Sequence, residues 1–319
     1  MVAIVSMAVI LLHPARMYFQ PDKPVPVTLD TRSIGALVKG RPLRLLMLTP
    51  GGGQEAGVEV DPGTTDLDLA ALFARKKPSG TDAGLWDGRT HYIQLMAGDT
   101  PVGSALVVIP LKDPKLPARP EPDSLRILVE RRVVLHTDLG DITVKLNHET
   151  APTTVMNFEH LVSGGFYTGV IFHRIVPGFV IQGGDPTGTG SGGPGYLIDL
   201  EASQKRHQRG TLSMARRASP DSGGSQFFIC LTRERCATLD TKYAAFGDVS
   251  SGMDVVNRIA AVELVDERSG RPVNPPVIQS AELVPAPPRK IAETPSAGRS
   301  SPPPPAREGA VAAGRPQAG

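Results

Sequence analysis

The chain has 319 residues, of which 40% are hydrophobic and 21% charged, and 34 basic against 32 acidic residues leave a net charge of +2. This apolar content suffices for a folded core, and the charge balance excludes the strongly basic footprint of a nucleic-acid-binding protein. The two cysteines, Cys230 and Cys236, exclude a disulfide scaffold and a zinc site of four thiolates. Whether they ever pair stays open.

Residues 1–17 contain an apolar run at 2–12. The run is shorter than the roughly 18 residues of a transmembrane helix, so we expect no transmembrane span. It is compatible with the core of a secretory signal, although no basic residue precedes it, and also with a buried strand. Export to the periplasm or cell surface and residence in the cytoplasm are therefore both open.

Residues 18–111 are predicted to form a small β domain that resembles a sandwich. Short apolar stretches end at turn residues, and residues 98–101 predict a hairpin turn. The predicted strands are 25–29, 44–48, 57–60, 91–96 and 102–109, and residues 66–73 fit one or two helical turns. Asp66 and Asp68 are a carboxylate pair without a partner, which we expect to be solvated. The pattern indicates a packing or interaction module.

Two proline-rich segments flank the rest of the chain. Residues 112–125 hold four prolines and are predicted to be an extended, semi-rigid linker. Residues 286–319 mix proline with Ala, Gly, Ser and Arg, and contain a polyproline run at 302–305. Such a composition buries too little apolar surface to offset the entropy of ordering, so we expect a disordered tail.

Residues 126–285 carry the strongest pattern of ordered structure. Strands are predicted at 133–137, 141–146, 172–176, 179–182 and 227–231, and helices at 155–162 and 253–262. Pro152 stands near the start of the first helix. Ten of the fifteen aromatic residues lie between Phe158 and Phe246. This pattern predicts a mainly β fold, a closed barrel capped by two helices.

The surrounding residues exclude three common catalytic or binding motifs. Residues 188–193 fit G-x-G-x-x-G, but Pro194 and Gly195 follow where a dinucleotide site needs a helix. The residues around Ser225 do not form a G-x-S-x-G elbow. The seven histidines include no H-x-x-x-H pair for zinc.

What remains is one cation among aromatic and amide side chains. Strand alternation places Phe172 and Arg174 on one face of a strand, and Gln226 and Phe228 on one face of another. A guanidinium beside rings and amides, with no matched acid or nucleophile, fits a reaction that forms no covalent bond. We therefore expect no metal or other cofactor.

Residues 131–284 resemble the cyclophilin family of peptidyl-prolyl cis-trans isomerases. The resemblance is carried by four segments: FHRIVPGFVIQGGDPTGTGSGGPGY (172–196), GTLSMAR (210–216), SGGSQFFIC (222–230) and LDTKYAAFG (239–247). It implies a closed, eight-stranded antiparallel barrel with two capping helices. It also implies an enzyme that accelerates Xaa–Pro isomerisation in proline-containing peptides and in unfolded or partly folded proteins. We expect a monomer, although the sequence does not identify the oligomeric state.

The resemblance also implies a role for each matching residue. Arg174 is the catalytic arginine, and Gln182 supports it and contacts the substrate backbone. Phe179, Val180 and Phe228 line the proline pocket, and Gln226 forms its polar wall. The remaining substrate-binding residues are Ala215 and Arg216 on the strand that pairs with the peptide, Leu239 on the apolar rim, and Tyr243.

Two residues depart from the eukaryotic pattern of the family. Tyr243 stands where many eukaryotic members have histidine and many bacterial members have tyrosine. Thr238 stands where eukaryotic forms have tryptophan, which puts binding of immunosuppressants in doubt. One competing hypothesis is a proline-peptide-binding scaffold or chaperone with little turnover, and a peptide isomerisation assay separates it from an active enzyme. Another makes the N-terminal β domain the main functional unit, an adhesion or client-docking module at the cell surface.

Overall fold

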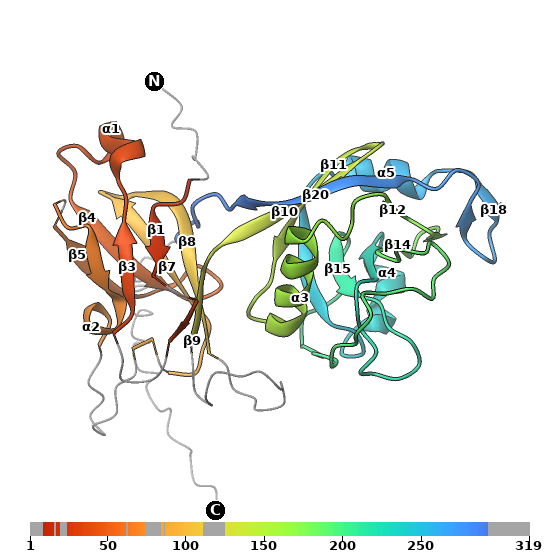
Figure 1. Ribbon diagram of the computed structural model, residues 1–319, viewed down its shortest axis with the longest axis horizontal. Coiled ribbons are helices and arrows are strands. Elements are labelled where there is room, and N and C mark those ends of the chain that lie inside the picture. The colour runs from red at the N-terminus through yellow and green to blue at the C-terminus, as the bar shows by residue number, and fades with distance from the viewer. Residues whose placement is uncertain are drawn as a thin grey trace, which may run out of the picture.

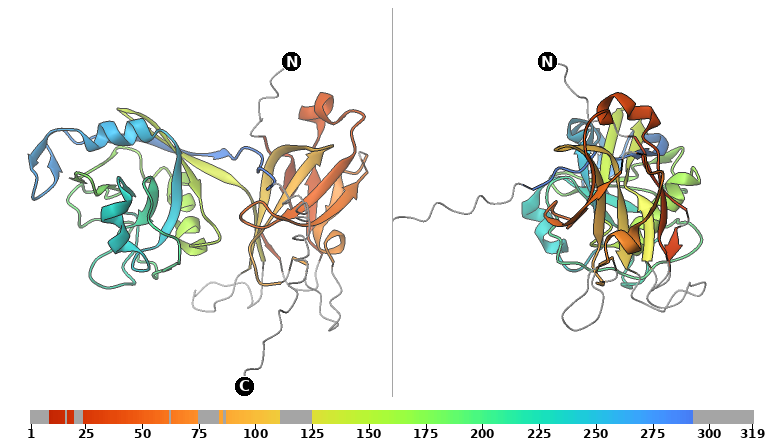
Figure 2. Two further views of the ribbon diagram at one scale, coloured as in Figure 1. Left: turned by 180° about the vertical axis from the view of Figure 1, so that it is seen from behind. Right: turned by 90° about the vertical axis from the view of Figure 1, so that its left-hand side faces the viewer.

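The computed structural model describes residues 9–15, 17–19, 24–61, 63–74, 84–85, 87–110 and 125–292. It is mainly β, as predicted, and its large sheets lie side by side in Figure 1 and in the left view of Figure 2. Among these residues no helix is long and apolar enough to cross a membrane. Residues 1–8, nearly all of the predicted linker and residues 293–319 lie outside the described part.

Residues before Glu130 form two antiparallel sheets. The three-stranded sheet has the order β1 (Leu12–Pro14), β3 (Pro26–Leu29), β6 (Asp66–Asp68). The six-stranded sheet has the order β2 (Tyr18–Phe19), β9 (Leu125–Val129), β8 (Thr100–Pro110), β7 (His91–Ala97), β4 (Leu43–Leu48), β5 (Gln54–Val60). Short helical segments are η1 (Arg32–Ile34), α1 (Gly35–Val38) and α2 (Leu69–Leu72).

Side chains from both sheets share one apolar cluster, in which Leu12 and Val27 of the smaller sheet join Leu45 and Ile93 of the larger one. The predicted strands are present, and the predicted hairpin is the β7–β8 pair. The N-terminal apolar run ends at Leu12, which is buried and pairs with Leu29 in strand β3. This end of the run is therefore a buried strand, one of its two interpretations.

Two expectations for residues 66–73 are corrected. The segment begins as strand β6 and becomes helical only at Leu69. Asp68 is not simply solvated, because its carboxylate accepts hydrogen bonds from the backbone N–H groups of Val25 (2.8 Å) and Ala70 (3.1 Å). It caps the short helix α2. Asp66 is exposed, as expected.

The C-terminal residues form a nine-stranded antiparallel sheet. Its order is β12 (Val170–Ile171), β20 (Val277–Pro285), β10 (Arg131–Thr137), β11 (Gly140–Leu146), β17 (Ala245–Ser251), β15 (Thr211–Met214), β16 (Phe227–Cys230), β14 (Val180–Gly183), β13 (Arg174–Val176). A separate hairpin pairs β18 (Leu264–Asp266) with β19 (Arg271–Pro272). The helical segments are α3 (Pro152–Ser163), α4 (Arg233–Cys236), η2 (Ala237–Leu239) and α5 (Met253–Ala260).

This sheet is curled around its core (Figure 1), and its strand number and edges differ from the predicted closed barrel of eight strands. The predicted strand at 172–176 is divided, because Phe172 and His173 belong to no strand. Phe172 is fully buried and contacts Phe227 edge-on, whereas Arg174 is exposed. The prediction that Phe172 and Arg174 share a face is therefore wrong, since alternation does not continue across the break.

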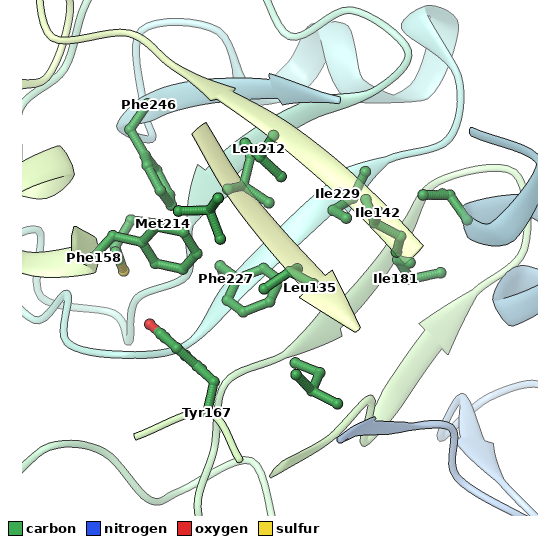
Figure 3. Packing of buried hydrophobic residues seen from close by; sticks show 14 of the residues in the cluster. Leu135, Ile142, Phe158, Tyr167, Ile181, Leu212, Met214, Phe227, Ile229 and Phe246 are labelled. Carbon is green, nitrogen blue, oxygen red and sulfur yellow. The ribbon is translucent and has the colours of Figure 1, made fainter. Parts of the chain in front are cut away.

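Aromatic rings fill the centre of the curled sheet (Figure 3). The ring of Phe158 from α3 lies 5.2 Å from Tyr167, 5.6 Å from Phe227 and 5.1 Å from Phe246, centroid to centroid. Such tilted and edge-on pairs are the favoured geometries between rings. Six of the ten aromatic residues in this part of the sequence thus belong to one packed core, which consists of Phe158, Phe166, Tyr167, Phe172, Phe227, Phe246 and their aliphatic neighbours.

Both predicted helices are present to within one turn. Pro152 opens α3, and the Glu201 carboxylate accepts the backbone N–H groups of Thr153 (2.9 Å) and Thr154 (2.6 Å), which the first helical turn leaves unpaired. Gly252 precedes α5 with φ +90°, and a Cβ there would lie 2.2 Å from the Asp141 carbonyl oxygen. Only glycine fits this start.

The junction between the two groups of strands differs from the predicted linker and tail. Strand β9 pairs with β8 of the six-stranded sheet, so the predicted boundary at residues 125 and 126 falls inside a strand. Residues 286–292 are not a disordered tail. Ala286 and Arg289 are buried, and Arg289 donates to both carboxylate oxygens of Glu130 (2.8 and 2.9 Å).

Candidate active site

Three neighbouring strands place the central site residues in one row. Arg174 on β13 is the cross-strand partner of Gln182 on β14, and Gln182 is the partner of Phe228 on β16. Cross-strand partners in an antiparallel sheet project to the same face. Arg174 is exposed and Phe228 is buried, so the row runs from solvent into an apolar environment.

The two polar residues of the row, Arg174 and Gln182, form a chain of hydrogen bonds with Gln226. Arg174 Nη1 donates to Gln182 Oε1 (3.4 Å), and Gln182 Nε2 donates to Gln226 Oε1 (3.0 Å). Gln226 Nε2 in turn donates to the carbonyl oxygens of Gly190 (3.1 Å) and Gly192 (2.9 Å). Because Gln182 Nε2 donates to Gln226, the amide oxygen of Gln182 faces the Arg174 guanidinium. Within the described residues Arg174 forms no salt bridge, so no carboxylate there accepts a hydrogen bond from its guanidinium.

An apolar cluster lies next to this row, which we call the outer cluster. Val180, Phe228, Cys230 and Cys236 are its buried members. The partly buried residues packed around them are Val176, Phe179, Ala215, Leu239 and Tyr243. The structure thus brings together six of the predicted substrate-binding residues from segments that are up to 64 positions apart in sequence, from Phe179 to Tyr243.

Ring contacts fix Phe228 within the outer cluster. Tyr243 meets Phe228 edge-on at 5.6 Å, and the imidazole of His207 stacks on it at 6.2 Å. Phe179 is flanked by Arg235, whose guanidinium carbon lies 5.2 Å from the ring centroid. These contacts hold the rings of Phe228 and Phe179 in place.

Ala215 and Arg216 follow strand β15 directly. The backbone N–H of Ala215 donates to the Gln226 carbonyl oxygen (2.9 Å). The Arg216 guanidinium lies 4.6 Å from the Tyr243 ring centroid, and its Nε donates to the Lys242 carbonyl oxygen (3.2 Å). The Arg216 guanidinium is thus held against the segment that contains Lys242 and Tyr243.

A cavity of about 390 Å³ adjoins the row and the outer cluster. Gln182, Ala215, Arg216 and Gln226 line it, together with residues 192–197. The Asp185 carboxylate orders this glycine-rich segment by accepting the backbone N–H groups of Thr187 (2.7 Å), Gly190 (2.6 Å) and Gly192 (3.1 Å). These bonds position the carbonyl oxygens that hold Gln226.

Sequence reasoning missed Asp185, His207 and Asp240 as members of the site. Burial lowers the pKa of His207 more than its Asp240 partner raises it, and its Nε2 lies 3.0 Å from Ser213 Oγ. The Arg233 guanidinium holds the pKa of Asp240 well below its usual range. Only Asp185 had a local indication, because an Asp followed two residues later by Thr favours a turn held by its own side chain.

The pKa of Asp185 gives a prediction for acid stability. Burial alone would raise this pKa, but the hydrogen bonds from Thr187, Gly192 and Gly190 outweigh burial and lower it from 3.8 to about 2. Because the folded-state value is the lower one, the carboxylate stabilises the fold above pH 3.8, and this stabilisation is lost as the pH falls toward 2.

We expect Asp185→Asn to lower the free energy of unfolding at pH 7 by about 1.5–3 kcal/mol. Denaturant unfolding of both proteins from pH 7 down to pH 2 measures the difference. The difference in the free energy of unfolding between wild type and variant should become smaller as the pH falls from 3.8 to about 2. A difference that is the same at both ends of this range would contradict the assigned role of the carboxylate.

Within the described residues, no group of three or more His, Cys, Asp or Glu side chains is arranged to hold a metal ion. The arrangement itself places an apolar cluster beside a guanidinium and two amides, which suits the binding of an apolar ring.

Comparisons with known proteins identify relatives of the C-terminal residues. The family model described as cyclophilin type peptidyl-prolyl cis-trans isomerase/CLD matches residues 132–283. Peptidyl-prolyl cis-trans isomerase B of Bacillus subtilis is 46% identical over 132 residues, which cover 41% of this chain and 90% of that protein. Peptidyl-prolyl cis-trans isomerase ppi1 of Schizosaccharomyces pombe is 46% identical over 148 residues, 45% of this chain and 92% of that one.

Longer proteins also match. Peptidyl-prolyl cis-trans isomerase CYP57 of Arabidopsis thaliana is 40% identical over 174 residues, which cover 51% of this chain and 34% of the relative. The chain therefore spans about a third of that relative's length. A crystal structure of a cyclophilin type peptidyl-prolyl cis-trans isomerase from Cryptosporidium parvum aligns with a TM-score of 0.45 at 34% identity, covering 48% of this chain and 96% of that one.

Proposed function

The chain belongs to the cyclophilin-type peptidyl-prolyl cis-trans isomerases, and from this premise we propose that Arg174, Gln182 and the outer cluster carry out isomerisation of Xaa–Pro bonds. The observation that carries this assignment is the row of cross-strand partners Arg174, Gln182 and Phe228. It sets a guanidinium beside an aromatic surface that fits a proline ring.

The mechanism follows from the electronic structure of the amide. Resonance holds the Xaa–Pro bond planar, with a rotational barrier of about 20 kcal/mol. In the twisted transition state the nitrogen has lost this resonance and carries a free lone pair. A guanidinium beside the ring donates a hydrogen bond to that lone pair far better than to the planar amide. Arg174 therefore binds the transition state more tightly than the ground state, which is the requirement for catalysis.

The other residues hold the substrate while the bond rotates. The ring of the substrate proline packs against Phe179 and Phe228, with Val180, Leu239 and Tyr243 around it. Gln182 accepts from the guanidinium and keeps it oriented. Gln226 and Ala215 line the adjoining cavity, where the neighbouring peptide residues bind, and Arg216 borders it. Water exclusion by the apolar side chains strengthens the contact of Arg174 with the nitrogen.

We propose that the substrates are proline-containing peptides and unfolded or partly folded proteins, and that the protein acts as a monomer. A short peptide with a single Xaa–Pro bond tests the activity of the whole chain, with cis-to-trans exchange as the readout. We expect exchange to be accelerated at enzyme concentrations far below that of the peptide. Tight binding of the peptide without acceleration would instead favour the scaffold hypothesis.

The architecture around the site is also part of this proposal. Edge strands β12 and β13 are separated only by Phe172 and His173, and Ile171 pairs with Asp185, next to β14. These contacts support closure of the curled sheet into a barrel through residues 170–176. The two N-terminal sheets and their shared core support a separate sandwich-like domain before Glu130.

Thr238 leads to a prediction about inhibition. It is exposed on η2, while the next residue, Leu239, packs against the outer cluster, so this loop reaches the pocket. Cyclosporin A, a large apolar cyclic peptide, covers the rim where related enzymes carry tryptophan. Loss of an aromatic contact and its hydrogen bond at such a position costs about 2–4 kcal/mol, or roughly thirty- to a thousandfold in affinity.

We therefore expect wild type to be an active isomerase that cyclosporin A inhibits poorly, and Thr238→Trp to gain sensitivity by that factor. Titration of cyclosporin A against both proteins in the same isomerisation assay measures the inhibition constant of each. Nanomolar inhibition of wild type, or no gain in the variant, would contradict this view of the rim.

A further inference from the structure

A second cavity, of about 660 Å³, lies between the N-terminal strands and helix α3. Figure 1 shows α3 on the side of the curled sheet that faces these strands. Met17, Arg126 and Leu128 line the cavity from the N-terminal side, and Met156, Tyr196 and Leu197 line it from the other. Its volume is within the range of about 300–1,000 Å³ that is usual for ligand sites.

The cavity gathers apolar side chains that remain open to solvent. Among the described residues five large hydrophobic side chains are exposed, and three of them line this cavity: Met17 (46%), Tyr196 (43%) and Leu197 (59%). A contiguous exposed apolar patch on a soluble protein marks a surface that binds something.

Arg126 adds a polar group that lacks a partner. Its side chain is 8% exposed, and its Nη2 is 3.4 Å from the Glu159 carboxylate. The Nε of the same guanidinium is buried and has no hydrogen-bond acceptor. A buried donor left unpaired is costly, so the site is suited to a ligand that brings an acceptor, such as a peptide carbonyl oxygen.

The second cavity adjoins the cavity beside Gln182 and Gln226, because Tyr196 and Leu197 line both. Tyr196 is fixed there: its hydroxyl donates to Asn157 Oδ1 (2.6 Å), and Asn157 Nδ2 donates to the Gly224 carbonyl oxygen (2.7 Å). The segment with Tyr196 and Leu197 therefore forms a firm ridge between the two cavities. An extended chain advances about 3.3 Å per residue, so a few residues are enough to cross it.

We propose that the second cavity binds the substrate polypeptide a few residues away from the proline, as an extended segment that carries apolar side chains. This rests on the proposed function, because it makes the N-terminal strands part of the substrate-binding surface of the isomerase. A polypeptide supplies both components that the cavity lacks, which are apolar side chains for Met17 and Leu197 and a carbonyl oxygen for Arg126.

The test compares two labelled peptides of equal length with the same central Xaa–Pro bond. In one the flanking segments are leucine-rich, and in the other they consist of serine and glycine. Fluorescence anisotropy gives the dissociation constant of each peptide for the full chain. We expect wild type to bind the leucine-rich peptide about tenfold more tightly, a difference of about 1.4 kcal/mol.

The variant is Met17→Ser with Met156→Ser, since both side chains line only the second cavity. We expect its affinity ratio to fall close to one, with the affinity for the serine-glycine peptide unchanged. Met17→Ser alone, at an exposed position, should lower the ratio in part and guards against misfolding of the double variant. Val265→Ser is the matched control, because Val265 is 62% exposed on β18, away from both cavities.

A wild-type ratio near one, or a ratio that the double variant keeps, would overturn the proposal. A wild-type dimer in sedimentation that the double variant dissociates would overturn it as well, because a second copy would then occupy the cavity. Turnover of a single-proline tetrapeptide is measured in parallel. If wild type fails to turn it over but keeps the affinity ratio, the catalytic assignment fails while the second binding site stands.

Discussion

Replacement of Arg174 by alanine is expected to lower kcat/KM on a short Xaa–Pro peptide by about a hundredfold or more, which corresponds to about 2.7 kcal/mol of transition-state stabilisation. In the proposed mechanism Arg174 is the cation that donates to the proline nitrogen. Arg216 does not replace it, since its guanidinium is engaged with the Tyr243 ring and the Lys242 carbonyl oxygen.

The loss should appear in kcat more than in KM. Arg174 is exposed and donates only weakly to Gln182, so its removal should leave the fold and the outer cluster intact. Arg174→Lys keeps the charge but loses the rigid fork of donors, and we expect an intermediate activity. An alanine variant with an unchanged circular dichroism spectrum and more than half of the wild-type activity would refute the role of Arg174.

The second large effect is expected from Arg289→Ala, which should lower the free energy of unfolding by about 3–5 kcal/mol. Arg289 and Glu130 form a bidentate pair in which the side chains are only 8% and 6% exposed. Arg289 also donates to the Pro50 carbonyl oxygen (2.8 Å), and its backbone N–H donates to Gln94 Oε1 (2.9 Å). Alanine would leave the buried Glu130 carboxylate without the guanidinium that donates to both of its oxygens.

Urea unfolding followed by circular dichroism measures this effect, and we expect the midpoint urea concentration to fall by about 1 M or more. Arg32→Ala is the matched control. Arg32 also forms an ion pair, with Asp30, but its side chain is 90% exposed, and such surface pairs contribute little to stability. Equal losses from the two variants would mean that burial does not decide the strength of the Arg289 pair.

The contrast between these two arginines shows which parts of the structure were predictable. Arg174 lies in a continuous motif that singles it out, although the motif did not predict that Phe172 lies on another face. Arg289 lies in a proline-rich segment, and its partner is 159 positions away, so no local pattern distinguishes it from a solvated arginine. The ordered part of the predicted tail was missed for this reason.

The same distinction applies to the strands. Alternating or continuous apolar runs, as in β4, β7, β8, β10 and β11, were found because they bury their side chains in a regular pattern. Strand β17 contains Gly, Asp and Ser, and most residues of β20 are only partly buried, so neither shows such a pattern. Strand β9 is apolar, but it directly follows the predicted linker, and its pairing with β8 is a tertiary contact.

For the site, the sequence indicated the members of the row and six of the nine residues of the outer cluster, but not how they are held. The orientation of Gln182 depends on Gln226, and Gln226 depends on carbonyl groups that Asp185 orders. His207 stacks on Phe228 from a loop that shows no motif of its own. Such supporting contacts arise from folding and are not encoded by the spacing of residues.

The central claim is that the Xaa–Pro bond rotates while its proline ring lies in the outer cluster. The most direct measurement is an NMR exchange experiment on a peptide with an isotopically labelled proline and a small amount of wild-type protein. We predict exchange peaks between the cis and trans resonances, together with nuclear Overhauser contacts from the proline ring to Phe228 and Phe179. Catalysed exchange with proline contacts at other residues, and none at Phe228 or Phe179, would contradict the assignment of the site.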